Sequence, residues 1–318
     1  MSAPDWLVVI TGPTAVGKTE ISIGVAKALD GEIVSCDSMQ VYKYMDIGTA
    51  KAGSEEQRMV PHHLIDVVTP DEDFNVARFQ ELAETAISDI ASRGKTPILV
   101  GGTGLYIKAV VDGFLFPWEG ASPEIRGSLE LEAKEKGNEA LYARLEQVDP
   151  AAAKKIHLND TRRIIRALEV YLTTGRPISE LWREGKRRKR ARLDRLVMIG
   201  LVRKREELYK RIDARCDKMM ELGLVKETKR LLEQGYSRTL TSGQALGYKE
   251  IVGHLNGEYS LEEAVDLIKR NTRRYAKRQL IWFRADPRVQ WLDVGVFDSA
   301  HEASKCILAL VKGKMAAM

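Results

Sequence analysis

The sequence predicts an α/β protein with a doubly wound parallel sheet, a mostly helical insertion and a helical C-terminal part. Over the first hundred residues, short apolar runs of strand character alternate with longer segments whose apolar residues recur at helical spacing. This alternation stops after about Phe116, at Pro117 and Trp118, and the stretch that follows is charged and helical. We therefore expect residues 1–117 and 196–318 to form the core, and residues 118–195 to form the insertion.

The elements of the predicted core follow in order from these patterns. The expected strands are 7–10, 32–35, 61–67, 97–100 and 196–201, and the expected helices of the first half are 18–29 and 76–91. Strands that alternate with helices imply right-handed crossovers, so the strands are parallel and their carboxyl ends share one edge. Residues 206–284 are nearly all helical in pattern, with Gly223, Gly235 and Gly257 as expected helix stops.

A glycine-rich turn joins the first strand to the first helix. The apolar run 7–10 leads into Gly12, and after four more residues come Gly17, Lys18 and Thr19. In this strand–helix context the spacing is that of a P-loop, whose glycines let successive backbone N–H groups face a phosphate. Lys18 adds a positive charge, and the Thr19 hydroxyl suits Mg²⁺. The core is therefore expected to be P-loop NTPase-like and to bind a di- or triphosphate.

Two more turns are expected at the same edge of the sheet. Asp37 follows the second strand, where a carboxylate would accept a proton from a nucleophile or hold Mg²⁺ through water; a capping role is the alternative. The turn 101–104 holds three glycines and Thr103, which fits either a tight turn or a substrate contact. Strand 97–100 ends in glycines, without the acidic residue that motor ATPases need, so group transfer fits better than hydrolysis.

Composition limits the remaining classes of function. The chain carries 50 Lys and Arg against 45 Asp and Glu, a net charge of +5, and 44% of its residues are hydrophobic, which is enough for a large core. Its three cysteines are far apart, which disfavours disulfides and zinc and fits a reducing cytoplasm. His62-His63 has no other cluster of metal ligands near it in the sequence, so a metal site there is disfavoured. Neither a signal peptide nor a membrane span is expected.

Positive charge is concentrated in two segments. Residues 183–195 hold eight Lys or Arg in thirteen positions, and residues 269–284 hold seven with no acidic residue. Tyr275, Trp282 and Phe283 are interleaved in the second segment, where aromatic rings can stack on bases. For either segment alone, a solvated helix face is the alternative. Both together, beside the arginines at 162, 163 and 166, favour binding to nucleic acid.

Eight motifs carry a resemblance to a known family. They are residues 12–19, 37–42, 46–51, 61–66, 101–106, 166–171, 244–249 and 275–279. In this order they resemble the tRNA dimethylallyltransferase family, the bacterial tRNA isopentenyltransferases, over most of the chain. Arg162 and Leu158 stand where many members have glutamine and proline, which bears on RNA contacts near 162 and not on the chemistry. The Cys- and His-rich finger of eukaryotic relatives is absent from this sequence.

The resemblance implies a reaction and a set of site residues. Members of the family transfer a dimethylallyl group from its diphosphate to the N6 amine of the adenine 3′-adjacent to the anticodon, in tRNAs that read codons beginning with U. The implied catalytic residues are Asp37, as general base, and Thr103, its partner at the adenine. The implied diphosphate ligands are Gly12, Thr14, Ala15, Val16, Gly17, Lys18, Thr19 and Arg215. The implied tRNA contacts are Asp37, Ser38, Met39, Gln40, Thr103, Arg126, Arg162, Arg163, Arg166, Ala245, Leu246, Gly247, Tyr248, Lys249, Arg274 and Lys277.

The resemblance also implies partners and a cofactor. Mg²⁺ is expected at Thr19, and the expected substrates are dimethylallyl diphosphate and the anticodon stem-loop of tRNA. We expect a cytoplasmic monomer without a membrane contact. Three other functions stay open on the residues alone: a small-molecule kinase, a prenyltransferase for free adenine nucleotides, and an RNA-binding module with a vestigial phosphate loop. The basic segments argue against the first two, and intact Lys18, Thr19 and Asp37 argue against the third.

Overall fold

The structure is a computed structural model that describes residues 6–113, 122–189, 195–236 and 242–316. It divides into two compact units, residues 1–107 with 194–318 and residues 108–193. The insertion that we expected from residue 118 therefore has its boundary earlier, inside the helix α4 (Gly104–Asp112). Each unit has its own core and is described by itself.

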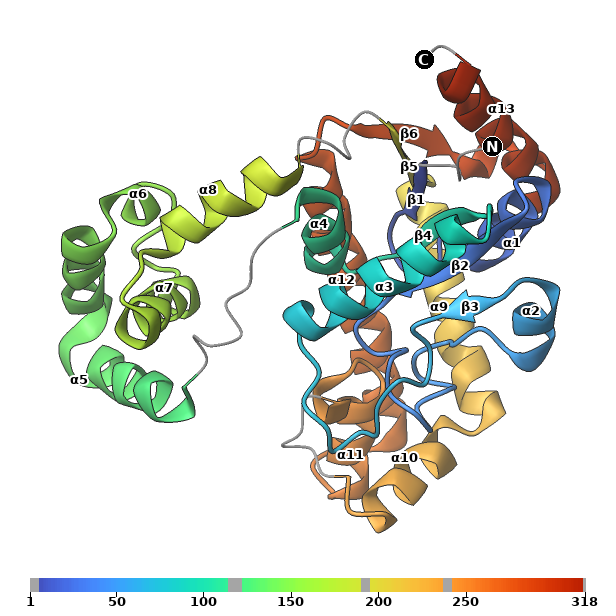
Figure 1. The fold of residues 1–318 in the computed structure, drawn as a ribbon. Coiled ribbons are helices and arrows are strands. Elements are labelled where there is room, and N and C mark those ends of the chain that lie inside the picture. The colour runs from blue at the N-terminus through green and yellow to red at the C-terminus, as the bar shows by residue number, and fades with distance from the viewer. Residues whose placement is uncertain (1–5, 114–121, 190–194, 237–241, 317–318) are drawn as a thin grey trace. The chain divides into compact units, whose positions relative to one another are not determined.

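The larger unit is built on one parallel sheet. Its strands are β1 (Leu7–Thr11), β2 (Gly31–Cys36), β3 (His62–His63), β4 (Thr96–Gly101), β5 (Leu196–Val202) and β6 (Val289–Asp293). Their order, among the described residues, is β3-β2-β4-β1-β5-β6, and every pair in it is parallel (Figure 1). Strand β1 lies at the centre, paired with β4 and β5, and its Val8, Val9 and Ile10 are completely buried. The predicted α/β fold class is confirmed.

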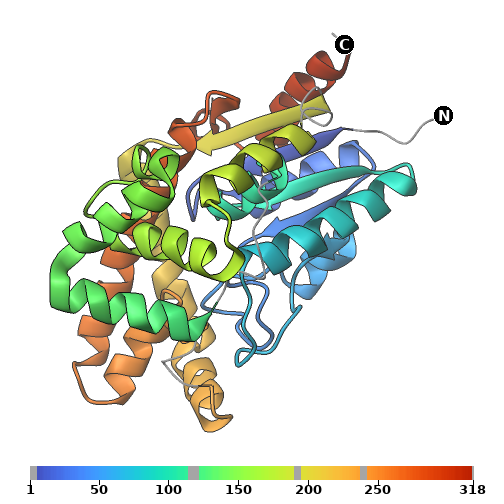
Figure 2. The same cartoon turned by 60° about the vertical axis from the view of Figure 1, so that its left-hand side comes forward.

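Helices cover both faces of this sheet. The remaining helices of the unit are α1 (Lys18–Ala28), α2 (Ser54–Met59), α3 (Val76–Ser92), α9 (Arg205–Leu222), α10 (Leu224–Glu233), α11 (Tyr248–Leu255), α12 (Leu261–Arg284) and α13 (Ala300–Ala316), with short 3-10 turns at Ser242–Gln244 and Val294–Val296. The crossovers β1-α1-β2 and β2-α3-β4 run in opposite directions along the sheet, and right-handed connections then place α1 and α3 on opposite faces (Figure 2). Helix α13 packs against α1, and α9 to α12 pack on one another.

Most predicted elements are present, with two differences. The strand expected at 61–67 is only β3, because Leu64 and Asp66 have φ of +63° and +55° and turn the chain out of the sheet. Helix α13 belongs to the helical C-terminal part that we expected, although its bounds were not predicted. The sixth strand, β6, carried no prediction: only its Val289 is buried, so it lacks the continuous apolar run of the central strands. The helix stops at Gly223, Gly235 and Gly257 are confirmed.

The smaller unit is helical, as expected. It contains α5 (Pro123–Val148), α6 (Pro150–Ala153), α7 (Thr161–Thr174) and α8 (Ile178–Lys189). Leu141, Leu145 and Leu168 lie in its apolar core. Glu169 of α7 is completely buried, and a buried carboxylate is costly unless it is paired. It accepts hydrogen bonds from Arg126 and Arg166, at 2.9 and 2.8 Å.

A second buried carboxylate lies at the amino end of β2. Glu32 is 3% exposed and accepts hydrogen bonds from Arg93 at 2.5 and 2.7 Å, with His63 at 2.8 Å and Lys95 at 3.2 Å. Hydrogen bonds from Arg93, and smaller contributions from His63 and Lys95, outweigh burial and lower the pKa of Glu32 from 4.5 to about 2. His63 thus serves this ion-pair cluster, and no group of three metal-ligating side chains occurs among the described residues.

We predict that Glu32 makes the stability of the protein depend on pH. Because the pKa is lower in the folded chain, the ionised carboxylate stabilises the fold above pH 4.5, and this contribution is lost as the pH falls from 4.5 towards 2. Glu32→Gln should lower the free energy of unfolding at pH 7 and differ little from the native chain near pH 2. Urea unfolding of both proteins at several pH values measures this. Parallel pH profiles of the two proteins would contradict it.

Candidate active site

Three strand ends meet at the carboxyl edge of the sheet. The chain leaves β1 into the phosphate loop, β2 into Asp37, and β4 into Gly102 and Thr103. Parallel strands direct their carboxyl ends to one edge, which is where open α/β sheets bind ligands. The Ser38 N–H donates to the Thr103 hydroxyl at 3.1 Å, which joins the turns after β2 and β4. The predicted convergence of these turns is confirmed.

The phosphate loop keeps a backbone that its glycines make possible. Gly12 has φ +146°, and a Cβ there would lie 2.6 Å from the Leu201 carbonyl oxygen of β5, so no side chain fits. Gly17, with φ +109°, is the left-handed cap from which α1 begins. The N-terminus of α1 therefore opens towards the loop, where its unpaired N–H groups favour an anion.

Lys18 points back over the loop. Its Nζ donates to the carbonyl oxygens of Gly12 and Pro13, at 3.0 and 2.8 Å. Burial, and to a smaller extent the nearby Arg215, lower the pKa of Lys18 from 10.5 to about 8, although the charge of Asp37 acts in the opposite direction. A bound anion would favour the charged form, because it adds negative charge beside the ammonium group.

Three side chains hold the loop from outside. Arg211 donates to the Ala15 carbonyl at 2.9 Å and Arg203 donates to the Val16 carbonyl at 3.1 Å. The Thr14 N–H donates to Gln279 Oε1 at 2.9 Å. None of these three residues was singled out from the sequence, although Gln279 ends the 275–279 motif. Their partners lie far away along the chain, so sequence spacing alone gives no signal for the contacts.

Asp37 is held by its own turn. Its Oδ1 accepts the N–H groups of Met39 and Gln40, at 2.9 and 3.3 Å. The capping interpretation is thus confirmed; both N–H groups use the same oxygen, and Asp37 also lines a cavity. The turn orients the carboxylate and leaves Oδ2 for a ligand.

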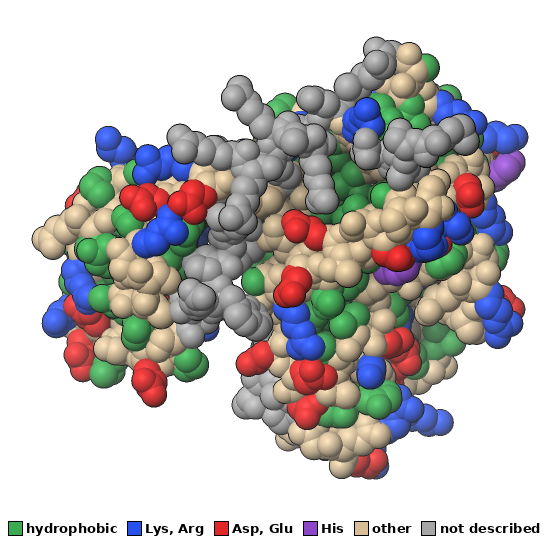
Figure 3. All heavy atoms as spheres, viewed as in Figure 1, with side chains coloured by type: hydrophobic (Ala, Val, Ile, Leu, Met, Phe, Trp, Pro, Cys, Tyr) green, Lys and Arg blue, Asp and Glu red, His purple; other side chains and the backbone are tan. Residues whose placement is uncertain are grey.

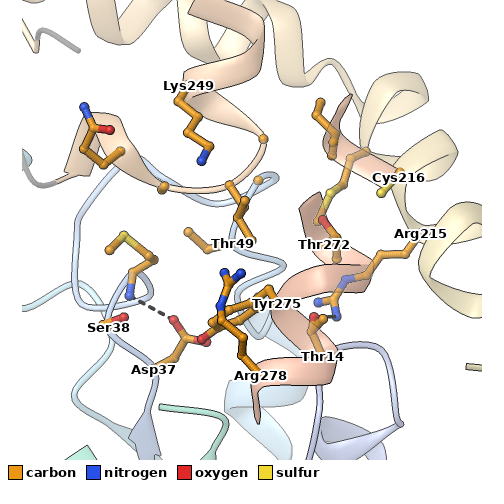
Figure 4. Close-up of a pocket in the computed structure, with 18 residues that line it drawn as sticks. Thr14, Asp37, Ser38, Thr49, Arg215, Cys216, Lys249, Thr272, Tyr275 and Arg278 are labelled. Carbon is orange, nitrogen blue, oxygen red and sulfur yellow. Dashed lines mark hydrogen bonds between the residues drawn. The ribbon is translucent and has the colours of Figure 1, made fainter. Parts of the chain in front are cut away.

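The cavity beside Asp37 has a volume of about 290 Å³. Figure 4 shows Thr14 and Arg215 on one side of it, Asp37 and Ser38 on the other, and Tyr275 and Arg278 between them. Arg215 donates to the Thr14 hydroxyl at 3.3 Å. The structure therefore opens the phosphate loop and the carboxylate into one space.

Tyr275 and Arg278 of α12 line the cavity between these two sides. The Tyr275 phenol hydrogen bonds with Thr103, and burial, together with the charge of Asp37, raises the pKa of Tyr275 well above its usual 10. The phenol therefore stays protonated and neutral. The Arg278 guanidinium lies 5.7 Å from the centre of the Tyr275 ring, a cation–π distance.

The segment 245–249 lines the same cavity through four of its five residues. Ala245, Leu246, Gly247 and Lys249 face it, and Lys249 points inward in Figure 4. The Tyr248 side chain is 2% exposed and turns away: its hydroxyl donates to Glu227 at 2.6 Å.

The loop 46–49, which contacts Tyr248 through the Gly48 N–H at 3.1 Å, is held by Glu227. The N–H groups of Asp46 and Ile47 donate to its carboxylate, at 3.2 and 3.1 Å, and the Gly48 N–H contributes a longer bond. Gly48 and Thr49 of this loop line the cavity. Glu227 and Tyr248 thus position a wall of the cavity from behind.

The other predicted RNA contacts lie in two places. Arg126, Arg162, Arg163 and Arg166 belong to the smaller unit, where Arg162 and Arg163 are exposed and the other two bind Glu169. Arg274 and Lys277 are exposed on α12 of the larger unit. Residues 190–194 of the basic segment 183–195 lie outside the described residues. On the face shown in Figure 3, basic and acidic side chains are intermixed, so the net charge alone identifies no binding surface.

A parallel sheet whose central strand feeds a phosphate loop at its carboxyl edge defines a P-loop α/β protein. The family model described as IPP transferase matches residues 40–286. The tRNA dimethylallyltransferase of Carboxydothermus hydrogenoformans is 57% identical over 291 residues, covering 92% of this chain and 93% of that protein. The same-named protein of Alkaliphilus oremlandii is 50% identical and covers 96% and 97%. This chain belongs to the IPP transferase family.

Solved structures agree with this assignment. The crystal structure of the tRNA isopentenylpyrophosphate transferase of Bacillus halodurans has a TM-score of 0.72 and 46% identity, and the match covers 98% of this chain and 99% of that one. A eukaryotic dimethylallyltransferase acting on tRNA has a TM-score of 0.83 and 32% identity, over 98% of this chain and 79% of that one. The resemblance of the eight motifs to this family is confirmed.

We predict that binding of inorganic diphosphate weakens above pH 8 through Lys18. With a pKa of about 8, only about a tenth of Lys18 is charged at pH 9, so the apparent Kd should rise about tenfold between pH 7 and 9. Lys18→Arg stays charged and should not show this rise. Isothermal titration calorimetry measures the Kd of both proteins at each pH. The protonation of diphosphate itself affects both proteins equally, so it cancels when their pH profiles are compared. Equal pH dependence in both would exclude Lys18 as the titrating group.

Proposed function

We propose that this chain transfers the dimethylallyl group of dimethylallyl diphosphate to the N6 amine of an adenine in tRNA. The observation that carries the proposal is that Thr14, Arg215 and Asp37 line the same cavity. We call the part at Thr14 and Arg215 the phosphate side, and the part at Asp37 the acceptor side. Relatives named tRNA dimethylallyltransferase support it over nearly the full length of the chain. A prenyl transfer needs both features in one space: an anion site for the leaving group and a base for the nucleophile.

The phosphate side acts on the leaving group. An allylic C–O bond breaks readily when the departing diphosphate is stabilised. The loop from Gly12 to Thr19 offers the start of α1, with Lys18 close by, and Arg215 is 3.3 Å from the Thr14 hydroxyl. Burial lowers the pKa of Arg215, which indicates that its guanidinium is poorly hydrated and gains from an anionic partner.

The acceptor side acts on the amine. The N6 lone pair of adenine is delocalised into the ring, so the amine needs to lose a proton as its bond to carbon forms. Asp37 lines the cavity with Oδ1 held by its turn, and its Oδ2 would take that proton. The Ser38 N–H and Tyr275 hold the Thr103 hydroxyl in place. This hydroxyl would orient the adenine ring.

Mg²⁺ fits the same site as an ion shared with the substrate. Mg²⁺ prefers oxygen ligands and usually takes one or two from the protein, with the rest from phosphates and water. Thr19, in the first turn of α1, would supply its hydroxyl, and Asp37 would contribute through water. The bound ion would neutralise charge on the leaving diphosphate.

The basic residues of both units would hold the RNA. The adenine must leave the stacked anticodon loop to reach Asp37, which costs a few kcal/mol. Arg274 and Lys277 on α12, and the arginines of the smaller unit, would offset this cost through contacts with phosphates. We further propose, from the family, that the target adenine is the one 3′-adjacent to the anticodon in tRNAs that read codons beginning with U, and that the enzyme is a cytoplasmic monomer. No described helix has the length and apolar character to cross a membrane.

A set of parallel incubations distinguishes the proposed function from the three alternative functions. The protein is given dimethylallyl diphosphate, Mg²⁺ and unmodified tRNA, and the digested nucleosides are analysed for dimethylallyladenosine. Parallel reactions supply AMP in place of tRNA, or labelled ATP with a nucleoside. Product only with AMP would favour a prenyltransferase for free nucleotides, and transfer of label from ATP would favour a kinase. RNA binding without any product would leave only the binding module.

We predict that Asp37→Asn lowers turnover about 10²- to 10⁴-fold, because the amide cannot accept the amine proton. Its affinity for tRNA should change little, since the amide oxygen can still accept the N–H groups of the turn. Asp30→Asn, at an exposed position beyond α1, is the control and should retain normal turnover. Single-turnover prenylation and filter binding measure the two quantities. Native turnover in the Asp37 variant would remove this residue from the base role.

We predict that Lys277→Ala weakens tRNA binding and leaves single-turnover rate at saturating tRNA unchanged. Losing one phosphate contact should reduce the slope of log K against log salt by about 0.7 to 0.9. Lys312→Ala on α13 is the matched control, because Lys312 is also exposed but lies on a helix that contributes no residue to the cavity. Equal salt slopes for the native chain and the Lys277 variant would place this lysine outside the RNA-binding surface.

A further inference from the structure

Gln279 connects two parts of the site that are far apart along the chain. It lies near the end of α12, and its side chain is 6% exposed. Its Oε1 accepts the Thr14 N–H of the phosphate loop at 2.9 Å. Its Nε2 donates to the Gly102 carbonyl oxygen at 3.0 Å. Because one amide atom accepts and the other donates, the two contacts fix the orientation of the side chain.

The packing around this amide leaves little space for movement. A Cβ on Gly102 would lie 2.2 Å from Gln279 Nε2 and 3.4 Å from the Gly12 carbonyl oxygen. The glycine turn, the phosphate loop and the Gln279 amide are therefore in direct contact. Loss of the amide would remove the only side chain, within the described part of the chain, that hydrogen bonds to both turns.

Both partners of Gln279 are next to residues of the proposed reaction. The Thr14 hydroxyl accepts from Arg215 on the leaving-group side. Gly102 directly precedes Thr103, whose hydroxyl accepts from the Ser38 N–H beside Asp37. One helical turn before Gln279, Tyr275 hydrogen bonds with Thr103 itself. Helix α12 thus contacts the donor side and the acceptor side of the cavity through residues four positions apart.

We propose that Gln279 is a positioning residue that sets the spacing between the phosphate loop and the Asp37–Thr103 pair. The inference rests on the proposed function, because the spacing matters only if a donor and an acceptor react across the cavity. Bond formation requires the amine nitrogen close to the allylic carbon, and a displacement of about 1 Å costs up to about 10²-fold in rate. Gln279 supplies no atom to the reaction.

A displaced acceptor also changes what the allylic carbon reacts with. When the amine is in place, the C–O bond to diphosphate breaks and a C–N bond forms, with the amine proton passing to Asp37. When it is not, water can attack the same carbon: a C–O bond to water replaces the C–O bond to diphosphate, and a proton leaves to solvent. The products are then dimethylallyl alcohol and diphosphate. Loss of spacing should therefore separate diphosphate release from RNA modification.

The test compares Gln279→Met with a control variant, Thr96→Val, in strand β4. Methionine has similar length and volume but neither donates nor accepts as an amide does. Thr96→Val removes another side-chain hydrogen bond, from Thr96 Oγ1 to the Leu29 carbonyl at 3.2 Å, at the opposite end of β4. Gln279→Asn, which keeps the amide but is one methylene too short to reach both partners, serves as the second variant if the methionine variant fails to fold. For each protein, kcat, KM for both substrates and the ratio of diphosphate released to tRNA modified are measured.

For Gln279→Met we expect kcat to fall about 10- to 100-fold, with KM values within about threefold of native and more than one diphosphate released per modified tRNA. Thr96→Val should keep native kcat and a ratio of one. The inference would be overturned if both Gln279 variants released one diphosphate per modified tRNA. It would also be overturned if their loss of activity were explained entirely by a lower thermal stability. If the native chain itself modifies no tRNA, the proposed function fails instead, so the two failures are distinguishable.

Discussion

Close contact between bare stretches of backbone at the carboxyl edge of the sheet underlies the whole site. A Cβ on Gly101 would lie 2.0 Å from the Cys36 carbonyl oxygen, and one on Gly12 would lie 2.6 Å from that of Leu201. Side chains cannot approach backbone this closely, so glycine at these junctions is what lets neighbouring strands deliver their next residues into one space. Thr14, Asp37 and Thr103 each follow such a junction within two residues.

The charged groups around the cavity influence one another. Lys18 and Arg215 are close enough that Arg215 lowers the pKa of Lys18, and Asp37 raises the pKa of both. Two poorly hydrated cations beside one carboxylate leave an excess of positive charge where the phosphate loop opens. On the proposed mechanism, an anion entering there would compensate the excess, and the carboxylate on the far side would remain available for a neutral nucleophile.

Much of this architecture was predictable because local patterns determine it. The buried strands β1 and β4, the helices α1 and α3 and the phosphate loop have periodicity or spacing that depends only on neighbouring residues. The edge strand β6 was not, since its middle residues face solvent and break the apolar run. Gln279 also escaped prediction: a polar residue in a basic helix has the pattern of a solvated one, and only tertiary packing brings it between residues 14 and 102.

The arrangement of Asp37 has a consequence for how the enzyme would recover after each cycle. Its Oδ1 is occupied by two N–H groups, which can only donate, so they offer no route for a captured hydrogen ion. The carboxyl group must then discharge through Oδ2, the atom that the modified base itself would cover. If Asp37 is the base, as proposed, its carboxylate would be regenerated only after the alkylated RNA has left Oδ2.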